Sequence, residues 1–420
     1  MSLKLFAPPK KDALHTGGKS TQSQGALLNT VEQIKVLLCK GKMTQPHILI
    51  LGVGRVGRAI ALDLASTYDV TALDRSAEAL ESLTREAPHI RTVQGHLNDS
   101  ALLNKLLSEA DLVITAVPGN MGYRALERVI QAGKKVVDIS FFPEDPYTLE
   151  ELAREKGATV IVDAGVAPGL SNFLLGYELA QKPVESFVCY VGGLPVERSW
   201  PFQYKAPFSP ADVMEEYTRP VRQRIGGVLL TKAPLSDLEL INIPGIGVLE
   251  GFNTDGLRTL LRNTTVPTLI EKTLRYPGHA EYIQVLAHTG FFSTAPITIS
   301  GQAVVPREMT AALLSKAWEM SPEDEDLTVM VVRIQHVSGD LVQYTLIDRA
   351  DTTRRISSMA RTTGYTCTAL AKWLLEGATL QPGIHAPEEL AGDEACFAYV
   401  MHHLATHGIQ ITRQTLQPLP

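Results

Sequence analysis

Short apolar runs alternate with segments of helical periodicity between residues 47 and 162. The strand-like runs are 47–51, 70–73, 92–93, 112–117, 136–139 and 159–162. The segments with helical spacing between them are 58–65, 77–83, 98–107, 123–132 and 148–156. Because the strand-like runs are apolar at successive positions, they are typical of strands buried on both faces. The pattern predicts an α/β fold of the Rossmann type, a doubly wound parallel sheet covered by helices.

A glycine-rich turn stands where the first predicted strand meets the first predicted helix. Gly52, Gly54 and Gly57 form a G-x-G-x-x-G string, in which they permit the tight turn, the approach of a pyrophosphate and close packing of helix on strand. The N–H groups at the start of the helix attract phosphate. We therefore predict a dinucleotide site that also includes Arg55 and Val56, rather than a glycine turn that binds no nucleotide.

Asp74 ends the second predicted strand. A carboxylate there accepts hydrogen bonds from ribose hydroxyls and repels a 2′-phosphate, so the position favours NAD. The adjacent Arg75 leaves NADP open, because a guanidinium can hold that phosphate if Asp74 turns away. The residues expected along the nicotinamide half are Val117, Pro118, Asp138 and Ser140. For these four, simple capping of strand ends is the alternative.

The pattern changes after Asp163. Pro and Gly become frequent and aromatic residues gather between Phe187 and Tyr217, which predicts a mixed or antiparallel sheet on the substrate side of a cleft. Further strands are expected at 327–335 and 341–348, and a helix at 365–376. Ahead of the main fold, residues 1–45 are interpreted as a tail that contains one amphipathic helix at 26–38.

Composition narrows the class of protein. The 39 basic and 45 acidic residues are mixed along the chain and give a net charge of −6, so no basic face suggests a nucleic-acid partner. No run approaches the ~18 to 20 apolar residues that a membrane helix requires. The four cysteines form no C-x-x-C pair, which favours a reducing, cytoplasmic setting without disulfides or a zinc site. We expect no metal cofactor.

The glycine turn with its Asp74-Arg75 pair also resembles the NAD-sensing regulatory domains of potassium channels, but the chain continues far beyond such modules. The longer chain resembles the saccharopine dehydrogenase family, and within it the L-lysine 6-dehydrogenases, over roughly residues 47 to 400. The stretches that carry the resemblance are Asp163–Asn172, Tyr190–Pro195, Glu215–Pro220, Thr254–Arg258, Thr273–His279 and Ala360–Tyr365.

This resemblance implies an architecture. The Rossmann domain would comprise residues 46–165 and 351–420, and an inserted α+β domain, residues 166–350, would bind substrate and form a homodimer. The implied reaction is NAD-dependent oxidation of the ε-amino group of L-lysine to the semialdehyde with release of ammonia. Two alternatives stay open: a saccharopine- or carboxyspermidine-forming reductase that uses NADPH, and a non-catalytic protein that senses NAD or NADH.

Such a reaction requires a base for the ammonium group and anchors for the amino acid. His279, in a Tyr-Pro-Gly-His turn, is the first candidate base and Asp163, after the last strand, is the second. Arg275 and Arg258 are candidate carboxylate anchors, and Asp255 and Glu216 are candidate partners of the ammonium. The remaining predicted wall consists of Tyr204, Tyr217 and Thr254. Core packing and structural salt bridges are the alternatives for these residues.

Overall fold

The computed structural model describes residues 45–208, 210–321 and 323–416. The predicted helix at 26–38 and the tail up to residue 44 lie outside the described residues. Within the described part of the chain, no helix combines the length and apolar character required to cross a membrane.

A seven-stranded parallel sheet forms the dinucleotide-binding region. Its strands are β1 (His47–Leu51), β2 (Asp69–Asp74), β3 (Arg91–Gln94), β4 (Leu112–Thr115), β5 (Lys135–Asp138), β6 (Thr159–Ile161) and β17 (Gly383–His385). Their order across the sheet is β17-β6-β5-β4-β1-β2-β3. The chain reverses its direction of strand addition between β1 and β4, and in such a sheet ligands bind beyond the carboxyl ends of the strands at this point.

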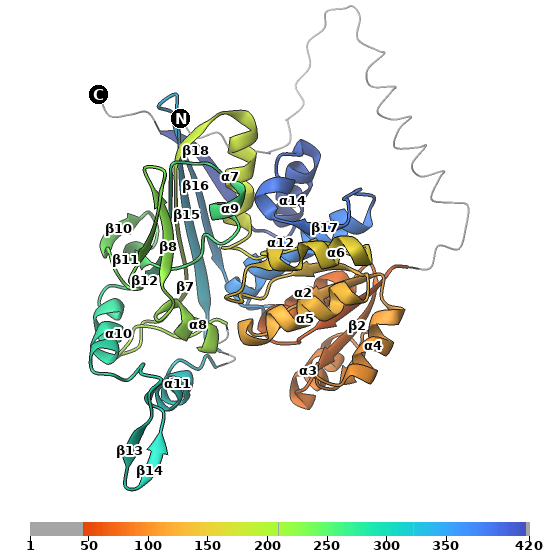
Figure 1. The fold of residues 1–420 in the computed structure, drawn as a ribbon, viewed down its shortest axis with the longest axis horizontal. Coiled ribbons are helices and arrows are strands. Elements are labelled where there is room, and N and C mark those ends of the chain that lie inside the picture. The colour runs from red at the N-terminus through yellow and green to blue at the C-terminus, as the bar shows by residue number, and fades with distance from the viewer. Residues whose placement is uncertain (1–44, 209, 322, 417–420) are drawn as a thin grey trace, which may run out of the picture. The chain divides into compact units, whose positions relative to one another are not determined.

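Helices cover both faces of this sheet (Figure 1). They are α2 (Arg55–Leu64), α3 (Ala77–Glu86), α4 (Ser100–Glu109), α5 (Gly119–Gln131), the 3-10 helix η1 (Pro146–Leu149), α6 (Glu150–Lys156) and α12 (Ser358–Leu375). Helix α14 (Glu394–Thr406) packs on α12, and the short α13 (Pro387–Leu390) follows β17. In β1, Ile48 and Ile50 join one hydrophobic cluster, and Leu49 and Leu51 join another. Successive side chains of a strand point to opposite faces, so the continuous apolar run buries both faces, and the predicted doubly wound fold is confirmed.

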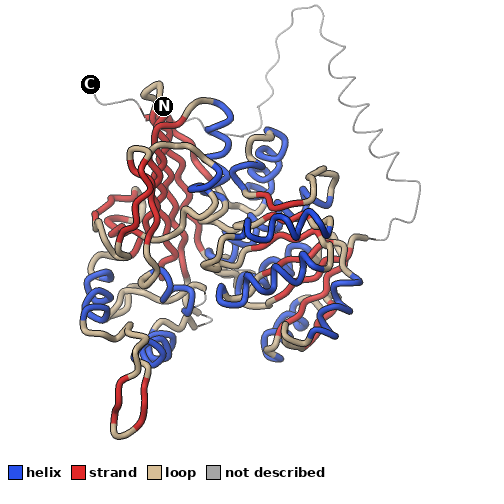
Figure 2. Tube along the Cα trace, in the orientation of Figure 1, coloured by secondary structure: helices blue, strands red, loops and turns tan. Residues whose placement is uncertain are grey.

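A second, mixed sheet contains nine strands. They are β7 (Val184–Pro195), β8 (Val221–Ile225), β9 (Val228–Lys232), β10 (Glu239–Ile243), β11 (Gly247–Asn253), β12 (Thr268–Arg275), β15 (Asp326–His336), β16 (Leu341–Arg349) and β18 (Ile411–Leu416). The main path is β10-β11-β12-β7-β15-β16-β18, with β8 against β12 and β9 against β8. Figure 2 shows its long strands beside the shorter ones of the first sheet.

The remaining elements lie along the chain just before β7 or in the connections between strands of this second sheet. They are α7 (Leu170–Gln181), α8 (Pro210–Glu216), α9 (Leu260–Asn263), α10 (His279–His288), the hairpin β13 (Ile297–Ile299) and β14 (Gln302–Val304), and α11 (Pro306–Ala317). Helix α12 contacts both β5 and β15, so it lies between the two sheets.

One boundary differs from the sequence interpretation. The segment 351–420 was expected to lie wholly in the Rossmann domain, and α12 indeed packs on α2. Strand β18, however, pairs with β16 from Leu341–Leu416 to Leu346–Ile411 and therefore belongs to the second sheet. The physical reason is that β16 is otherwise an edge strand with unpaired backbone groups, and β18 pairs with them.

Candidate active site

A single cavity of about 990 Å³ runs from the glycine turn to the second sheet. It passes the carboxyl ends of β4, β5 and β6, where Val117, Pro118, Ser140 and Asp163 line it. It continues to β12 and to residues 254–256. The predicted cofactor and substrate regions therefore share one space.

The glycine turn has the close contacts expected of its spacing. A Cβ at Gly57 would lie 2.0 Å from the carbonyl oxygen of Gly52, and a Cβ at Gly52 would lie 2.4 Å from that of Ala116. Gly52 also has a φ of +99°, which favours glycine. A Cβ at Gly54 would meet nothing within 4 Å among the described residues. Gly54 thus borders open cavity at the start of α2, where a phosphate group would be received.

Asp74 is held against this turn. One of its carboxylate oxygens accepts a hydrogen bond from the N–H of Val53 at 2.6 Å, and the other accepts from the N–H of Ser76 at 2.8 Å. Both Asp74 and Arg75 line the cavity, and Arg75 is exposed there. The two groups that were expected to set cofactor preference therefore lie at the same end of the cavity.

Two predicted cofactor residues have other contacts. Arg55 lines the cavity, but its guanidinium donates to the carbonyl oxygens of Ala206 and Met320 at 3.0 and 2.9 Å. These hydrogen bonds connect the glycine turn to the loops that contain Ala206 and Met320. Asp138 does not line the cavity. It is buried within the sheet, accepts a hydrogen bond from the hydroxyl of Thr115, and burial raises its pKa to about 7. Val56, by contrast, lines the cavity as expected.

Strand β12 supplies three side chains to the substrate end. Glu271, Thr273 and Arg275 stand two residues apart and all line the cavity, because alternate residues of a strand share a face. Glu271 accepts hydrogen bonds from the hydroxyl of Thr254 at 2.8 Å and the N–H of Gly256 at 3.0 Å. Burial raises the pKa of Glu271 to about 8. Sequence reasoning missed Glu271, although the same two-residue alternation, followed back from Arg275, leads to it.

Arg275 is fixed by protein groups. Its guanidinium donates to Glu216 at 2.7 Å and, at longer distances, to the hydroxyls of Tyr217 and Tyr204. The ring of Tyr204 lies 4.4 Å from its guanidinium carbon. Arg275 and Glu216 line the cavity, whereas Tyr204 and Tyr217 stand behind them, packed around Trp318.

His279 lies at the end of this hydrogen-bond chain and away from the cavity. Its Nδ1 lies 2.8 Å from the carbonyl oxygen of Phe202, and its Nε2 lies 2.9 Å from the hydroxyl of Tyr217. A carbonyl oxygen only accepts, so Nδ1 carries the proton and Nε2 accepts from Tyr217. Burial lowers the pKa of His279 to about 3. Because it is fully buried and absent from the cavity wall, the structure does not bring the first candidate base to the substrate.

Asp163, the second candidate base, does line the cavity. One carboxylate oxygen accepts from Nε of Arg258 at 2.7 Å, and the other has no hydrogen-bond partner among the described residues. Burial raises the pKa of Asp163, although Arg258 acts in the opposite direction. Arg258 itself does not line the cavity, so the structure places it as the partner of Asp163 and not as a carboxylate anchor.

Asp255 and Glu216, the predicted partners of the substrate ammonium, are already paired with arginines. Asp255 lines the cavity, but it accepts two hydrogen bonds from the guanidinium of Arg222, at 3.1 and 2.8 Å. Glu216 is paired with Arg275. Burial raises the pKa of Glu216. Among the carboxyl groups on the cavity wall, Asp163, Glu216 and Glu271 have raised pKa values. Asp163 is paired with Arg258 and Glu216 with Arg275, whereas no arginine among the described residues pairs with Glu271.

Two family models match the chain. The saccharopine dehydrogenase NADP binding domain matches residues 48–161, and the saccharopine dehydrogenase C-terminal domain matches residues 165–409. This chain belongs to the saccharopine dehydrogenase family. The resemblance to the saccharopine dehydrogenase family is thereby confirmed, and membership of this family supports oxidoreductase chemistry with a pyridine nucleotide.

Related proteins of the saccharopine dehydrogenase family include the saccharopine dehydrogenase [NADP(+), L-glutamate-forming] of Schizosaccharomyces pombe. It is 27% identical over 296 residues, which are 66% of this chain and 66% of that protein. The alpha-aminoadipic semialdehyde synthase of Arabidopsis thaliana is 23% identical over 80% of this chain and 36% of that protein. The chain thus spans about two thirds of the length of the first of these relatives.

Two solved structures share the fold of this saccharopine dehydrogenase family member. Apo saccharopine dehydrogenase (L-Glu forming) from Saccharomyces cerevisiae superposes with a TM-score of 0.71 at 20% identity, covering 88% of this chain and 100% of that one. Homospermidine synthase from Legionella pneumophila in complex with NAD superposes with a TM-score of 0.64 at 14% identity, covering 89% and 92%. At these identities the likeness shows the fold alone.

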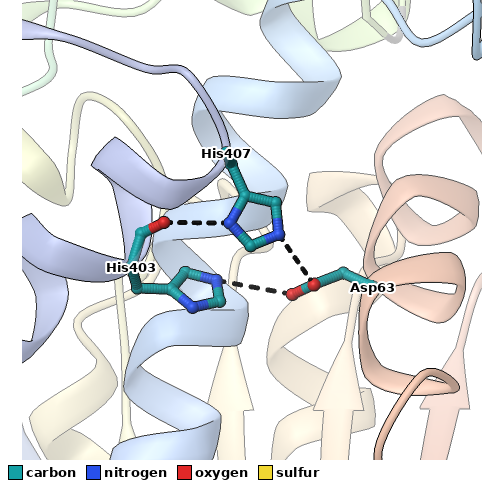
Figure 3. Close-up of side chains that lie close together, drawn as sticks. All are labelled: Asp63, His403 and His407. Atoms are coloured by element: carbon teal, nitrogen blue, oxygen red, sulfur yellow. Dashed lines mark hydrogen bonds and ion pairs between the residues drawn. The ribbon is translucent and has the colours of Figure 1, made fainter.

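A second polar cluster lies outside the cavity, where α2, α12 and α14 meet. Asp63, His403 and His407 place their ligand-type atoms within 4.8 Å of one another (Figure 3). Both oxygens of Asp63 already accept from the ammonium of Lys372, at 3.0 and 3.1 Å. Both ring nitrogens of His407 face acceptors, Asp63 and the carbonyl of His403, at 2.8 and 2.9 Å. Nitrogens that donate have no lone pair for a metal, so these contacts describe an ion-pair network between helices.

Proposed function

We propose that this protein is an NAD-dependent oxidoreductase that removes the ε-amino group of L-lysine, or of a close basic amino acid, yielding the semialdehyde and ammonia. The observation that carries the proposal is the continuous cavity that joins the glycine turn to the buried carboxyl groups of Asp163 and Glu271. Titratable groups with raised pKa values in such a cavity are candidates for acid–base chemistry.

The proposed reaction requires a base and a group that binds the amine. When bound, the nicotinamide accepts a hydride from the carbon that carries the neutral amine, which leaves an imine that water hydrolyses to the aldehyde and ammonia. The substrate ammonium, with an ordinary pKa of about 10.4, must first lose a proton, and a base with a pKa near the working pH does this best. The pKa of about 8 makes Glu271 the proposed base. Asp163, with one carboxylate oxygen unpaired among the described residues, would hold the amine.

NAD is proposed as the cofactor because of Asp74. Its carboxylate is fixed beside the glycine turn by two backbone N–H groups, so a 2′-phosphate at the ribose would approach a negative charge. Arg75 is the group that would favour NADP, and the related saccharopine dehydrogenase of Schizosaccharomyces pombe carries NADP(+) in its name.

A second candidate function is supported by those relatives. Saccharopine dehydrogenases that form L-glutamate match this chain over about two thirds of its length or more. A protein of that activity would act on the secondary amine of saccharopine, or in reverse condense an amine with an aldehyde and reduce the imine. The same cavity and the same carboxyl groups would serve that chemistry.

One assay separates these possibilities. Purified protein is incubated with NAD or NADP and, separately, L-lysine, saccharopine, ornithine or 1,5-diaminopentane, and absorbance of the reduced cofactor is followed. NADH formed with L-lysine supports the first proposal. Reduced cofactor formed only with saccharopine supports the second. Tight binding of NADH without turnover of any substrate contradicts both and supports a sensing protein.

A further inference from the structure

Arg219 follows α8 and lines the cavity with a buried guanidinium. Its side chain is only 11% exposed. Nε and Nη1 have no hydrogen-bond partner among the described residues, and Nη2 comes no closer than 3.9 Å to the carboxylate of Glu215. Buried donors in folded proteins are nearly always paired with protein groups, water or ligand. These unpaired donors therefore require a partner that the described side chains do not supply.

The carboxylates around Arg219 are committed to other arginines. Glu215 pairs with Arg307, and Asp255 is held by two hydrogen bonds from Arg222. Glu216 pairs with Arg275. The positive charge of Arg219 thus lacks an aligned counter-charge. Burial accordingly lowers the pKa of Arg219 below that of an ordinary arginine.

The other arginines of the cavity wall do not offer the same donors. Arg55 donates to two backbone carbonyls, and the guanidinium of Arg275 is held by Glu216 and two tyrosines. Arg75 is exposed at the ribose end. Arg219 instead stacks over the ring of Phe141, 4.6 Å from its centre, just beyond the carboxyl end of β5. Its guanidinium therefore lies on the cavity wall beside the residues that follow β5, next to Ser140 of the expected nicotinamide half.

We propose that Arg219 binds the carboxylate of the amino-acid substrate, in place of Arg275 and Arg258, which were predicted for that role. A carboxylate has the charge and the acceptor oxygens that unpaired guanidinium N–H groups bind best. The phosphates of the cofactor have their own site at the glycine turn and the N-terminus of α2. This inference rests on the proposed function, because it assumes that the substrate is an amino acid bound in this cavity.

The test compares substrates with and without the carboxylate. L-Lysine and 1,5-diaminopentane carry the same terminal amine, and only L-lysine carries the carboxylate. For Arg219→Met, kcat/KM with L-lysine should fall by about 100-fold, as loss of one partner of a buried ion pair does. The value with 1,5-diaminopentane and the KM for NAD should change less than about threefold. Arg219→Lys, which keeps the charge, should recover part of the activity with L-lysine.

A matched control is Arg262→Met, which removes an exposed arginine paired with Asp145 outside the cavity wall and should leave both substrates unaffected. Equal losses of kcat/KM for both substrates, or a raised KM for NAD alone, would overturn the assignment. The thermal unfolding temperature of each variant shows whether it is folded.

A second readout separates this inference from the proposed function. If the wild-type protein oxidises none of the amines, the reaction is wrong, and binding is then measured by thermal shift in the presence of NAD. L-Lysine or saccharopine should raise the unfolding temperature of the wild type and not that of Arg219→Met. Equal shifts for both proteins, or no shift for the wild type, would reject Arg219 as the carboxylate site.

Discussion

At the residue scale, Glu271 illustrates how burial determines what a side chain can do. It stands on β12 among polar neighbours, but among the described residues only two groups donate to its carboxylate, and burial raises its pKa to about 8. A carboxyl group with such a pKa exchanges protons at neutral pH, unlike an exposed glutamate. Because Glu271 also lines the cavity, it is the proposed base.

Glu271→Gln should therefore lower kcat by about 100- to 10,000-fold, the usual range for a lost general base. In the wild type, kcat/KM should rise with pH and level off above about pH 8, where Glu271 is ionised. The residual activity of Glu271→Gln should lack this rise with pH, the acidic limb of the pH–rate profile. A pH–rate profile of both proteins checks this, and an unchanged limb in Glu271→Gln would assign the proton transfer to another group, with Asp163 as the next candidate.

The substitution Glu271→Gln, which should lower activity, should raise the stability of the fold at high pH. Because the folded-state pKa of Glu271 is raised, the fold favours the protonated form, and its contribution to stability declines as pH rises from about 4.5 to about 8. The neutral amide escapes this decline. At pH 9, Glu271→Gln should be more stable than the wild type by roughly 1–4 kcal/mol, and at pH 4 the two should be nearly equal. Urea unfolding at both pH values measures the difference.

Cofactor preference is a second prediction at this scale. Asp74→Asn removes the negative charge beside the ribose end but keeps the size of the side chain. The ratio of kcat/KM for NAD to that for NADP should fall about tenfold, which corresponds to ~1.4 kcal/mol. Arg75→Ala should change the ratio in the opposite direction. If Asp74→Asn leaves the ratio unaltered, the charge of Asp74 does not determine which cofactor is bound.

The sequence predicted part of the site at the level of residues. The glycine turn and Asp74 were accessible because their roles depend on local geometry. The sequence did not indicate Glu271 or Arg219 as site residues, and it indicated His279 as a base. The reason is that burial and pairing depend on tertiary neighbours. Nothing in the local sequence tells that Tyr217 and Phe202 enclose His279, or that Arg222 and Arg307 engage the carboxylates near Arg219.

At the element scale, alternation of strands and helices was predicted well from β1 to β6, because strands such as β1 and β4 are apolar and buried on both faces. Strand β3 is the exception, with no fully buried residue. Two short C-terminal pairings were not predicted. Strand β17 has three residues and completes the edge of the first sheet beside β6, and β18 does so beside β16 in the second. Edge pairings depend on which backbone N–H and C=O groups lack partners. A pattern of apolar residues carries little information about these unpaired groups.

Two substitutions in the glycine turn separate the role of a glycine in packing from its role in ligand binding. Gly57→Ala places a Cβ against the carbonyl of Gly52 and should destabilise the fold by about 1–3 kcal/mol, the usual cost of overpacking. Gly54→Ala meets open space and an ordinary φ of −66°. It should leave stability within about 0.5 kcal/mol but weaken NAD binding tenfold or more. Thermal unfolding and calorimetric titration with NAD distinguish the two; equal stability of both variants would refute the packing argument.

Asp63 joins three helices, and its contribution should depend on pH. Although burial alone would raise it, hydrogen bonds from His403 and His407 and the ammonium of Lys372 hold the pKa of Asp63 well below 3.8. The stabilisation is therefore complete above that value and is lost as pH falls below it. Asp63→Asn should cost about 3–5 kcal/mol at pH 7, and the difference from the wild type should shrink toward pH 3. Chemical unfolding across this range checks the trend, and a constant difference would contradict it.

At the scale of the whole molecule, the second sheet ends in exposed apolar strands. Val228, Leu229 and Leu230 are consecutive on β9 and all exposed, so both faces of that strand are uncovered. Among the described strands β9 pairs only with β8, and β10 is the edge of the main path. Leu240 on β10 is 68% exposed. Contiguous exposed apolar groups, such as the three on β9, are typical of interaction surfaces.

These strands are where we place the predicted homodimer, since the resemblance assigned dimerisation to the inserted region. In light scattering after gel filtration, Leu240→Lys combined with Leu229→Lys should give particles of the chain mass, 45.8 kDa, and the wild type should give twice that mass. Val337→Lys is the matched control, because Val337 is similarly exposed, at 63%, but lies in the turn after β15. Its mass should equal that of the wild type. If the double variant keeps the wild-type mass while Val337→Lys loses it, the interface lies at the other end of the sheet; a monomeric wild type would rule out the dimer.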